Sequence, residues 1–387
     1  MENFVHNIPT QLHFGKDAIA CLPEVIGRYG KNVLLVYGGG SIRKIGLYDR
    51  IMYLLKDFNV VECGGIEPNP RIESVERGSV LCKENHIDVV LAAGGGSTID
   101  AAKAICVGAY FEGDDYWEIV TTKGVKRKAL PLVDILTLSA TGSEFDGGGV
   151  ISNLKTNEKM GNSFTYPSVS ICDPQYTYSV NAYQTAAGSI DIMSHVLEGY
   201  FSRSEGVDLS DGIAEVILKS VIRNLPIALK KPDDYEARAN LMMASSVACS
   251  GIPEYGKTYS GWVCHGLEHE LSAWYDITHG VGLAIVTPVW MRYILKKDPS
   301  ITPRFVSFAK NVFHLEDEDD TKLAYKGIDE LEKFFTETGI PMKLSQLGID
   351  DSHFQEMAQH VNRSGRLSNA SVSLNEEDAV NILRMCL

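Results

Sequence analysis

The segment 87-IDVVLAAGGGSTIDAAKAI-105 limits the possible folds of this chain more than any other. It contains a short apolar run, VVLAA, then three glycines, and then a segment with helical character. The same order recurs at 33–40, where VLLVY is followed by three glycines. A strand, a glycine turn and a helix in succession form the repeating unit of α/β proteins, in which helices cover both faces of a parallel sheet.

Other segments of the first half continue this alternation. Residues 71–86 have the apolar spacing of an amphipathic helix, and residues 132–138 and 169–173 have the composition of buried strands. We therefore predict an α/β dinucleotide-binding domain with a Rossmann-like parallel sheet at residues 1–180.

The second half has a different pattern. After about residue 181 strand-like runs stop and helical periodicity continues to the end, most clearly in residues 211–229, 235–251 and 321–339. Gly251 and Gly339 stand where glycine commonly ends a helix. We predict an all-α domain at residues 181–387, and the length of 387 residues also favours two domains over one core.

Composition excludes several classes of protein. The net charge of −14 argues against nucleic-acid binding, which needs a basic surface. No run of about 18 apolar residues is present, so we expect no membrane span, and the N-terminus lacks the features of a signal peptide. The eight cysteines are scattered and form no CxxC motif, which is typical of reduced thiols. We expect a cytoplasmic protein.

The glycine turn after the strand at 89–93 indicates a phosphate-binding site. Its glycines allow backbone N–H groups to approach an anion, and the hydroxyl residues after them can cap the following helix. A tight turn without a ligand is the alternative, and neither a GxGxxG nor a P-loop motif is present. We interpret the turn as a nucleotide-binding loop made of Gly94, Gly95, Gly96, Ser97 and Thr98.

The glycine turn after the strand at 33–37 bears on the choice of dinucleotide. That strand is not followed by the acid that often binds the ribose hydroxyls of NAD. Arg43 and Lys44 are close by, although such a pair is often only a solvated surface charge. We therefore favour NADP(H) over NAD(H), with binding groups at Gly38, Gly39, Gly40 and Ser41.

Histidines and one aspartate form a second pattern. Asp191 and His195 are four residues apart, so a helix places them next to each other, opposite an apolar stripe. His265 and His269 repeat this spacing, and His279 follows Thr278, which is a plausible N-cap of the next helix. Each of these residues alone is more often structural or solvent-facing. Together, one carboxylate and several imidazoles favour a site for one divalent metal ion, Fe²⁺ or Zn²⁺.

These motifs together resemble the iron-containing alcohol dehydrogenase family, in particular its butanol dehydrogenase and NADPH-dependent aldehyde reductase branch. The resemblance extends over essentially the whole chain and is strongest in 36-VYGGGSIRKIGLYD-49, 92-AAGGGSTIDAAKAI-105, 140-ATGSE-144, 191-DIMSH-195 and 265-HGLEHELSAWYDITHG-280. It implies hydride transfer between a nicotinamide dinucleotide and a small primary alcohol or aldehyde, such as butanol or butanal. A homodimer is implied as well.

The resemblance also implies roles for individual residues. His269 matches a histidine near the substrate that is a candidate proton carrier. The positions that match the family's metal ligands are Asp191, His195, His265 and His279. Beyond the glycine turns, the positions that match residues lining the cofactor are Asn69, Thr137, Thr141, Ser143 and Lys159. One departure from the family pattern is Asp146, which stands where asparagine is usual.

Two other interpretations stay open at this stage. A dehydroquinate synthase-like or glycerol-phosphate-type enzyme can use the same scaffold, but such substrates are anionic. The metal-ligand region here is instead flanked by aromatic residues, Trp262, Trp274 and Tyr275. The other possibility is a dinucleotide-binding relative that has lost its activity, which the four intact ligand positions argue against.

Overall fold

The two strands that precede glycine turns lie side by side in one sheet. In the computed structural model, which describes residues 1–387, β2 (Asn32–Tyr37) pairs in parallel with β4 (Val89–Gly94). The sheet has six strands in the order β1-β8-β5-β4-β2-β3, and every neighbouring pair is parallel. The remaining four strands are β1 (Gln11–Phe14), β3 (Asn59–Cys63), β5 (Leu132–Leu136) and β8 (Val169–Cys172).

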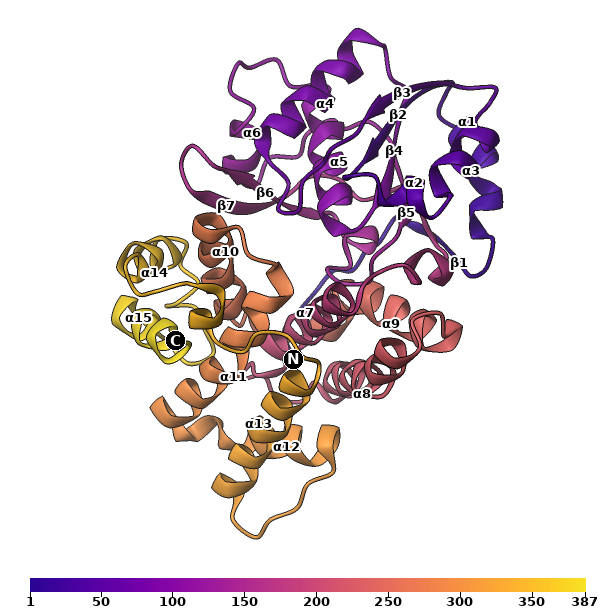
Figure 1. Ribbon diagram of the computed structural model, residues 1–387. Helices are drawn as coiled ribbons and strands as arrows, with labels where there is room; N and C mark the ends of the chain where they lie inside the picture. The colour runs from indigo at the N-terminus through magenta and orange to yellow at the C-terminus, as the bar shows by residue number, and fades with distance from the viewer. The chain divides into compact units, whose positions relative to one another are not determined.

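Alternation along the strands gives the sheet two buried faces. Val33 and Leu35 belong to one hydrophobic cluster, and Leu34 and Val36 belong to the other. Because successive strand residues point to opposite faces, a continuous apolar run is what a sheet covered on both sides requires. Figure 1 shows the helices on the two sides: α1 (Leu22–Gly27) and α3 (Leu47–Leu54) on one, and α4 (Ile72–Glu84) and α5 (Gly96–Gly108) on the other. The predicted fold class is confirmed.

Several details of this region differ from the sequence-based expectation. The predicted capping by Ser97 and Thr98 is wrong: the N-cap of α5 is Gly95, and both hydroxyl residues lie within the first turn of the helix. A two-stranded antiparallel hairpin, β6 (Gly148–Asn153) and β7 (Glu158–Ser163), was not predicted. Its strands contain glycines and little apolar alternation, so periodicity gives no signal there. Two short helices, α2 (Ser41–Lys44) and α6 (Glu118–Thr121), complete the region.

The second half of the chain is helical. By its contacts the chain divides into an α/β unit, residues 7–180 and 231–246, and a helical unit, residues 1–6, 181–230 and 247–387. This division differs from a single boundary after residue 180, because most of α9 (Tyr235–Ala248) is grouped with the α/β unit. Periodicity predicts that a helix forms but not which core it packs against.

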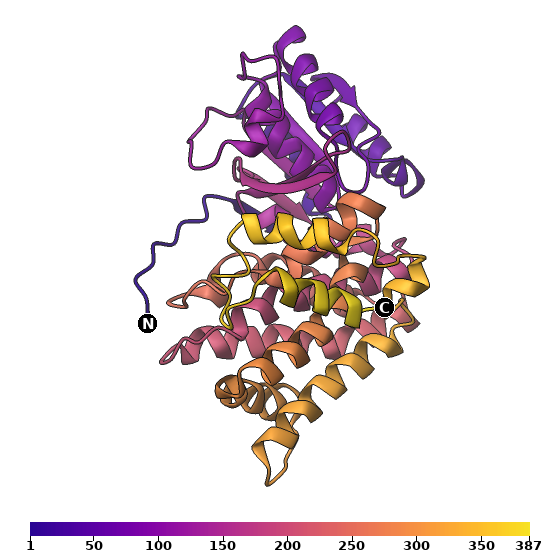
Figure 2. The ribbon, with the colours of Figure 1, turned by 90° about the vertical axis from the view of Figure 1, so that its left-hand side faces the viewer.

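Eight α-helices build the helical unit. They are α7 (Ala182–Tyr200), α8 (Asp208–Lys230), α10 (Val263–Tyr275), α11 (His279–Lys297), α12 (Thr302–Phe313), α13 (Asp320–Glu337), α14 (Phe354–Arg363) and α15 (Glu376–Met385). α11 packs on α7 and α10, and the last two helices, yellow in Figure 2, pack on each other. None of the helices combines the length and apolar character needed to cross a membrane. The eight cysteines form no disulfide.

A buried hydrogen-bond chain crosses the α/β unit. Ser170 Oγ lies 2.5 Å from Asp134 Oδ2 and 2.6 Å from the carbonyl oxygen of Glu144. A hydroxyl has one hydrogen and cannot donate to two acceptors at such distances, so Asp134 must be protonated and donate to Ser170. Burial raises the pKa of Asp134 well above its usual range, and Asp134 is 0% exposed. The sheet therefore contains a neutral carboxylic acid.

The protonation of Asp134 predicts how Asp134→Asn changes the free energy of unfolding with pH. Between the usual Asp pKa of about 4 and the raised folded-state pKa, the folded protein binds more protons than the unfolded one, so the wild type loses stability as pH rises. Asparagine has the same shape and no titration. We expect the stability difference to shift in favour of the variant by up to about 1.4 kcal/mol per pH unit above pH 4, measured by urea unfolding at pH 5 to 8. A difference independent of pH would contradict a protonated Asp134.

Candidate functional site

Asp191 and His195 lie one turn apart on α7. The helix begins after Asn181, whose side chain accepts a hydrogen bond from the Gln184 N–H. Both faces of the helix are buried here, and Asp191 is 2% exposed. His195 Nδ1 lies 2.8 Å from the Asp191 carbonyl oxygen and 3.1 Å from its Oδ1. The predicted i, i+4 adjacency is therefore present, but in the interior and not on a wet face.

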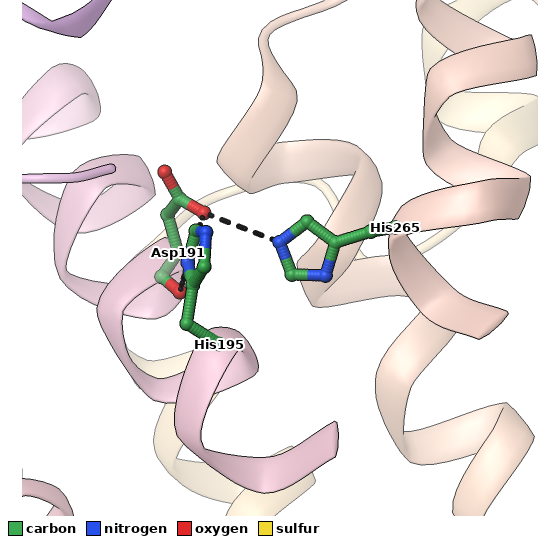
Figure 3. A group of neighbouring side chains, drawn as sticks. All are labelled: Asp191, His195 and His265. Atoms are coloured by element: carbon green, nitrogen blue, oxygen red, sulfur yellow. Dashed lines mark hydrogen bonds and ion pairs between the residues drawn. The ribbon is translucent and has the colours of Figure 1, made fainter. Parts of the chain in front are cut away.

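Two further histidines approach the same carboxylate oxygen from other helices. His265, on the first turn of α10, places Nε2 3.9 Å from Asp191 Oδ1, and His279, the first residue of α11, places Nε2 3.6 Å away. Figure 3 shows Asp191, His195 and His265 converging on one point. The structure thus brings together all four residues at the predicted metal-ligand positions.

Close packing between α7 and α11 permits this convergence. A Cβ atom at Gly280 would lie 2.0 Å from the carbonyl oxygen of Ala187, so only glycine allows α11 to begin against α7. Thr278 is the N-cap of α11, as predicted, although its side chain makes no capping hydrogen bond. These contacts position His279 opposite Asp191.

Two buried glutamates that the sequence analysis did not identify contact the ligand histidines. Glu198 on α7 accepts a hydrogen bond from His265 Nδ1, and Glu268 on α10 accepts one from His279 Nδ1. Their relation to the histidines depends on contacts between elements, which spacing does not reveal. The available signal was weaker: each glutamate follows a histidine by three residues, His195 in one case and His265 in the other.

The charges of this cluster are mutually dependent. Burial raises the pKa of Asp191, but the neighbouring His195, His279 and His265 outweigh this and lower it below its usual range. Burial, together with the other two imidazoles, lowers the pKa of His265 well below its usual value. Burial also raises the pKa of Glu198 to about 7, although two backbone N–H groups oppose this. The pKa of His195 is raised well above its usual value, against its burial, by charges that include the Asp191 carboxylate. Metal binding would displace any proton held on its ligand nitrogens.

Buried polar atoms without partners show that the cluster fits a divalent ion. Asp191 Oδ1 and His265 Nε2 are both buried and have no hydrogen-bond partner, although they face each other. Potential ligand atoms of Asp191, His195 and His265 all lie within 4.8 Å of one another. A carboxylate oxygen and imidazole nitrogens suit Fe²⁺ and Zn²⁺ alike. These three residues therefore fit one such ion, while His279 also offers a ligand atom within 4.8 Å of atoms of Glu268 and His269.

His269 lies beside the cluster but outside the group around Asp191. Its ring centroid is 5.7 Å from that of His279 and 6.4 Å from that of His265. It is 8% exposed, so it is neither fully enclosed nor a surface residue. This position suits the predicted role of a proton carrier next to a metal site.

In the α/β unit, the two glycine turns lie next to each other. They follow β2 and β4, which are neighbours in the sheet and end on the same side. From β2 the chain crosses first to β3 on one side and then back to β4 on the other, so the strand order changes direction between these two strands. Open parallel sheets bind dinucleotides at such a switch point. The turns are therefore placed as a dinucleotide site requires.

Glycine occurs in the two turns for different physical reasons. Cβ atoms at Gly39 and Gly40 would meet nothing within 4 Å, so the backbone of the first turn is open to a ligand. In the second turn, Cβ atoms at Gly94, Gly95 and Gly96 would come within 2.4, 3.1 and 2.2 Å of Thr98, Leu138 and Thr141. Packing alone therefore accounts for the second run, and the open first turn is the stronger indication of phosphate binding.

Three of the other predicted cofactor residues can be placed by backbone contacts within the α/β unit. Thr137 donates its N–H to the Gly94 carbonyl oxygen at 2.9 Å, beside the second turn. Asn69 and Lys159 both lie near Ser152. The Ser152 N–H donates to the carbonyl oxygen of Pro70, which follows Asn69, and Ser152 pairs with Lys159 in the hairpin.

Thr141 and Ser143 lie on the loop after β5. Thr141 Oγ1 is 3.4 Å from the Ser143 N–H, and Thr141 also packs against Gly96. Ser143 is 2% exposed and donates its hydroxyl to Asp100 Oδ1 at 2.5 Å, so its side chain is already used within the fold.

Asp146 also has a partner in the fold. Its Oδ1 lies 2.7 Å from Lys103 Nζ and accepts a hydrogen bond from the Gly148 N–H at 2.9 Å. The Lys103 side chain is 0% exposed, and a buried ammonium group requires a compensating charge. The acid that departs from the family pattern thus balances Lys103.

An acid does lie beside the first turn. Glu62 on β3 pairs with Arg43 at 2.9 Å and accepts hydrogen bonds from the hydroxyls of Tyr37 and Tyr48 at 2.7 and 2.8 Å. The Arg43 guanidinium also stacks on the Tyr48 ring at 3.6 Å. Arg43 is therefore a paired residue and not a free cation at the edge of the turn.

Comparison with known families gives a match over most of the chain. Residues 9–174 match the profile described as iron-containing alcohol dehydrogenase, and residues 185–387 match that of the Fe-containing alcohol dehydrogenase family, C-terminal. Together the two regions include every predicted metal-ligand and cofactor residue.

Individual relatives agree with this match. The chain is 48% identical to NADH-dependent butanol dehydrogenase A of Clostridium acetobutylicum, over 99% of each chain. It is 36% identical to the NADPH-dependent aldehyde reductase YqhD of Escherichia coli, over 94% of each. The crystal structure of NADH-dependent butanol dehydrogenase A from Thermotoga maritima superimposes with a TM-score of 0.94 at 39% identity, covering 100% of this chain and 99% of that one.

The geometry predicts the effect of removing one ligand. We expect His265→Ala to weaken binding of Zn²⁺ or Fe²⁺ by more than about 100-fold, because losing a ligand costs more than losing the group that orients one. Metal content after dialysis measures this, and circular dichroism checks the fold. His360→Ala, which removes a histidine paired with Glu270, is the control. Stoichiometric metal in the His265 variant would contradict the ligand assignment.

Proposed function

Because the chain belongs to the iron-containing alcohol dehydrogenase family, we propose that it reduces small aldehydes and oxidises the corresponding primary alcohols with a nicotinamide dinucleotide and one divalent metal ion. The observation that carries this proposal is the convergence of His195, His265 and His279 on the buried Asp191. An ion bound there would act as a Lewis acid on the substrate oxygen. The dinucleotide would supply or accept the hydride.

The protein's own residues would bind, orient and protonate. Backbone N–H groups of the open turn at Gly39 and Gly40 would bind the diphosphate of the dinucleotide, since a glycine backbone can approach an anion closely. His269 would give or take the proton of the substrate oxygen, because it lies beside the ligand histidines.

An aromatic side chain supports an apolar substrate. The Trp262 ring lies 4.8 Å from the His265 ring and 5.6 Å from the His195 ring. Trp274, which the sequence analysis grouped with it, instead stacks on His353 at 4.0 Å. One indole beside the ligands still favours an alkyl chain such as that of butanal over a phosphorylated substrate. Family membership likewise disfavours the lyase and glycerol-phosphate alternatives.

We further propose NADH as the preferred dinucleotide. The sequence-based preference for NADP(H) rested on the absence of an acid after β2. Glu62 on the neighbouring strand supplies a carboxylate there and already pairs with Arg43, which leaves that cation less able to bind a 2′-phosphate. Of the relatives named above, one is NADH-dependent and another is NADPH-dependent. The proposal that this chain uses a nicotinamide dinucleotide therefore holds whichever of the two it prefers.

We also propose a homodimer in the cytoplasm. The homodimer is supported by the resemblance to the family, and the cytoplasmic location by the reduced-thiol composition. Size-exclusion chromatography with light scattering measures the mass in solution, and twice the chain mass of 42.5 kDa is expected.

The cofactor proposal predicts the effect of Glu62→Gln. Removing this carboxylate frees Arg43 and removes a repulsion, so the ratio of kcat/KM for NADPH to that for NADH should rise about tenfold, or ~1.4 kcal/mol. Butanal reduction followed at 340 nm measures both rates. Glu24→Gln, which breaks the exposed Arg28–Glu24 pair, should leave the ratio unchanged. An unchanged ratio in the Glu62 variant would contradict the proposal.

The catalytic proposal is tested with metal-stripped protein. Butanal-dependent oxidation of NADH should be absent without metal and return with Zn²⁺ or Fe²⁺. His269→Ala should lower kcat by about 100-fold or more, the range of general acid–base catalysis, while metal content remains at one ion per chain. If neither metal restores oxidation, the protein is better explained as a relative that has lost its activity. Full turnover in the His269 variant would exclude His269 as the proton carrier.

A further inference from the structure

Both predicted ligand histidines outside α7 are held between two carboxylates. His265 directs Nδ1 at Glu198 and Nε2 at Asp191, and His279 directs Nδ1 at Glu268 and Nε2 at Asp191. Glu198 is 1% exposed and Glu268 is 0% exposed. The two pairs are built from different helices but have the same order: a buried glutamate, an imidazole and the shared aspartate.

This order determines which ring nitrogen carries the hydrogen. A neutral imidazole has one N–H and one lone pair. Both oxygens of Glu198 already accept from backbone N–H groups, and one oxygen of Glu268 accepts from a hydroxyl, so both glutamates act as hydrogen-bond acceptors here. The nitrogen that faces the glutamate is therefore the N–H, so the lone pair of Nε2 points toward Asp191. A metal ion binds the lone pair, and the other nitrogen needs a partner that fixes the tautomer and the ring orientation.

Other hydrogen bonds hold the two glutamates in place. Glu198 accepts from the N–H groups of Cys264 and His265 at 2.7 and 3.1 Å. These N–H groups lie in the first turn of α10, where no helical carbonyl is available to them. Glu268 accepts from the hydroxyl of Ser272, one turn along the same helix. Each carboxylate is thus anchored independently of the imidazole ring that it faces.

We propose that Glu198 and Glu268 are positioning residues that hold His265 and His279 in the Nδ1–H tautomer and so set the metal affinity of the centre. The inference rests on the proposed metal-binding function. It assigns to these glutamates no contact with the ion, the substrate or the dinucleotide. Their contribution acts through the two histidines.

Substitutions separate charge from orientation. Glu268→Gln can keep both hydrogen bonds, because its oxygen can accept from His279 and its amide can donate to the rotatable Ser272 hydroxyl. Glu268→Ala loses both. Glu198→Gln has one acceptor oxygen for three N–H donors and must leave one unsatisfied. The matched control is Glu270→Gln, on the same helix as Glu268. The Glu270 carboxylate pairs with His360 Nδ1 at 3.0 Å and not with a predicted ligand.

The first test is metal affinity, measured by chelator competition with Co²⁺ and Zn²⁺. We expect binding to weaken about 10- to 100-fold in Glu198→Gln and Glu268→Ala, less in Glu268→Gln, and not in Glu270→Gln. The visible absorption of bound Co²⁺ should change in the first two. Wild-type affinity and spectrum in all variants would overturn the inference. So would binding of two ions per chain in the wild type and one in Glu268→Ala, because Glu268 would then be a metal ligand.

The second test needs no variant and no metal. Nitrogen-15 NMR of metal-free wild-type protein reports the protonated nitrogen of each neutral histidine, and we expect Nδ1–H at His265 and His279. Nε2–H at both would overturn the inference even if the glutamate variants fail to fold. A wild type that binds no metal would instead refute the proposed function, which the tautomers do not test.

Discussion

A carboxylate that is 2% exposed needs compensating charge or hydrogen bonds to remain ionised, and this requirement organises the helical unit around Asp191. Three imidazoles surround it, with ring nitrogens 3.1, 3.6 and 3.9 Å from one carboxylate oxygen, and a divalent ion held among these groups would supply the positive charge. The histidines come from three helices, so those helices must meet at this point. Glycine at position 280 and the hydrogen bonds of Glu198 to the start of α10 allow them to do so. Packing and the proposed metal binding therefore depend on the same residues.

In the α/β unit the constraint is different: backbone N–H groups of two turns must lie close together, without side chains between them. Its parallel sheet reverses strand order between β2 and β4, and both strands end in glycine turns there. Gly39 and Gly40 leave open space at the first turn, whereas Gly94 and Gly96 permit close packing at the second. Buried charges in this unit, such as Lys103 with Asp146, are balanced within the fold.

Periodicity and spacing predicted much of this organisation. The strands at 33–37 and 89–93, the change to helices near residue 181 and the adjacency of Asp191 and His195 follow from local patterns. Such patterns are local consequences of side-chain direction, so they identify elements and residues that share a face. The full set of four ligand positions came from the family resemblance.

What could not be predicted depends on contacts between distant segments. Glu198 and Glu268 resemble ordinary helical glutamates until α7, α10 and α11 are assembled. Glu62 is recognisable as the acid beside the first turn only once β3 is paired with β2. The glycines at 94–96 suggested a ligand, although their close neighbours Leu138 and Thr141 are more than forty residues away in sequence. Sequence spacing contains no information on these neighbours.

Asp191 and three histidines are proposed here to form one metal centre. X-ray absorption spectroscopy of the protein loaded with one equivalent of Zn²⁺ tests it most directly. We expect a first shell of nitrogen and oxygen at about 2.0–2.2 Å, with the outer-shell scattering that imidazole rings produce. A shell with sulfur at about 2.3 Å, or one without imidazole scattering, would place the ion elsewhere and contradict the account.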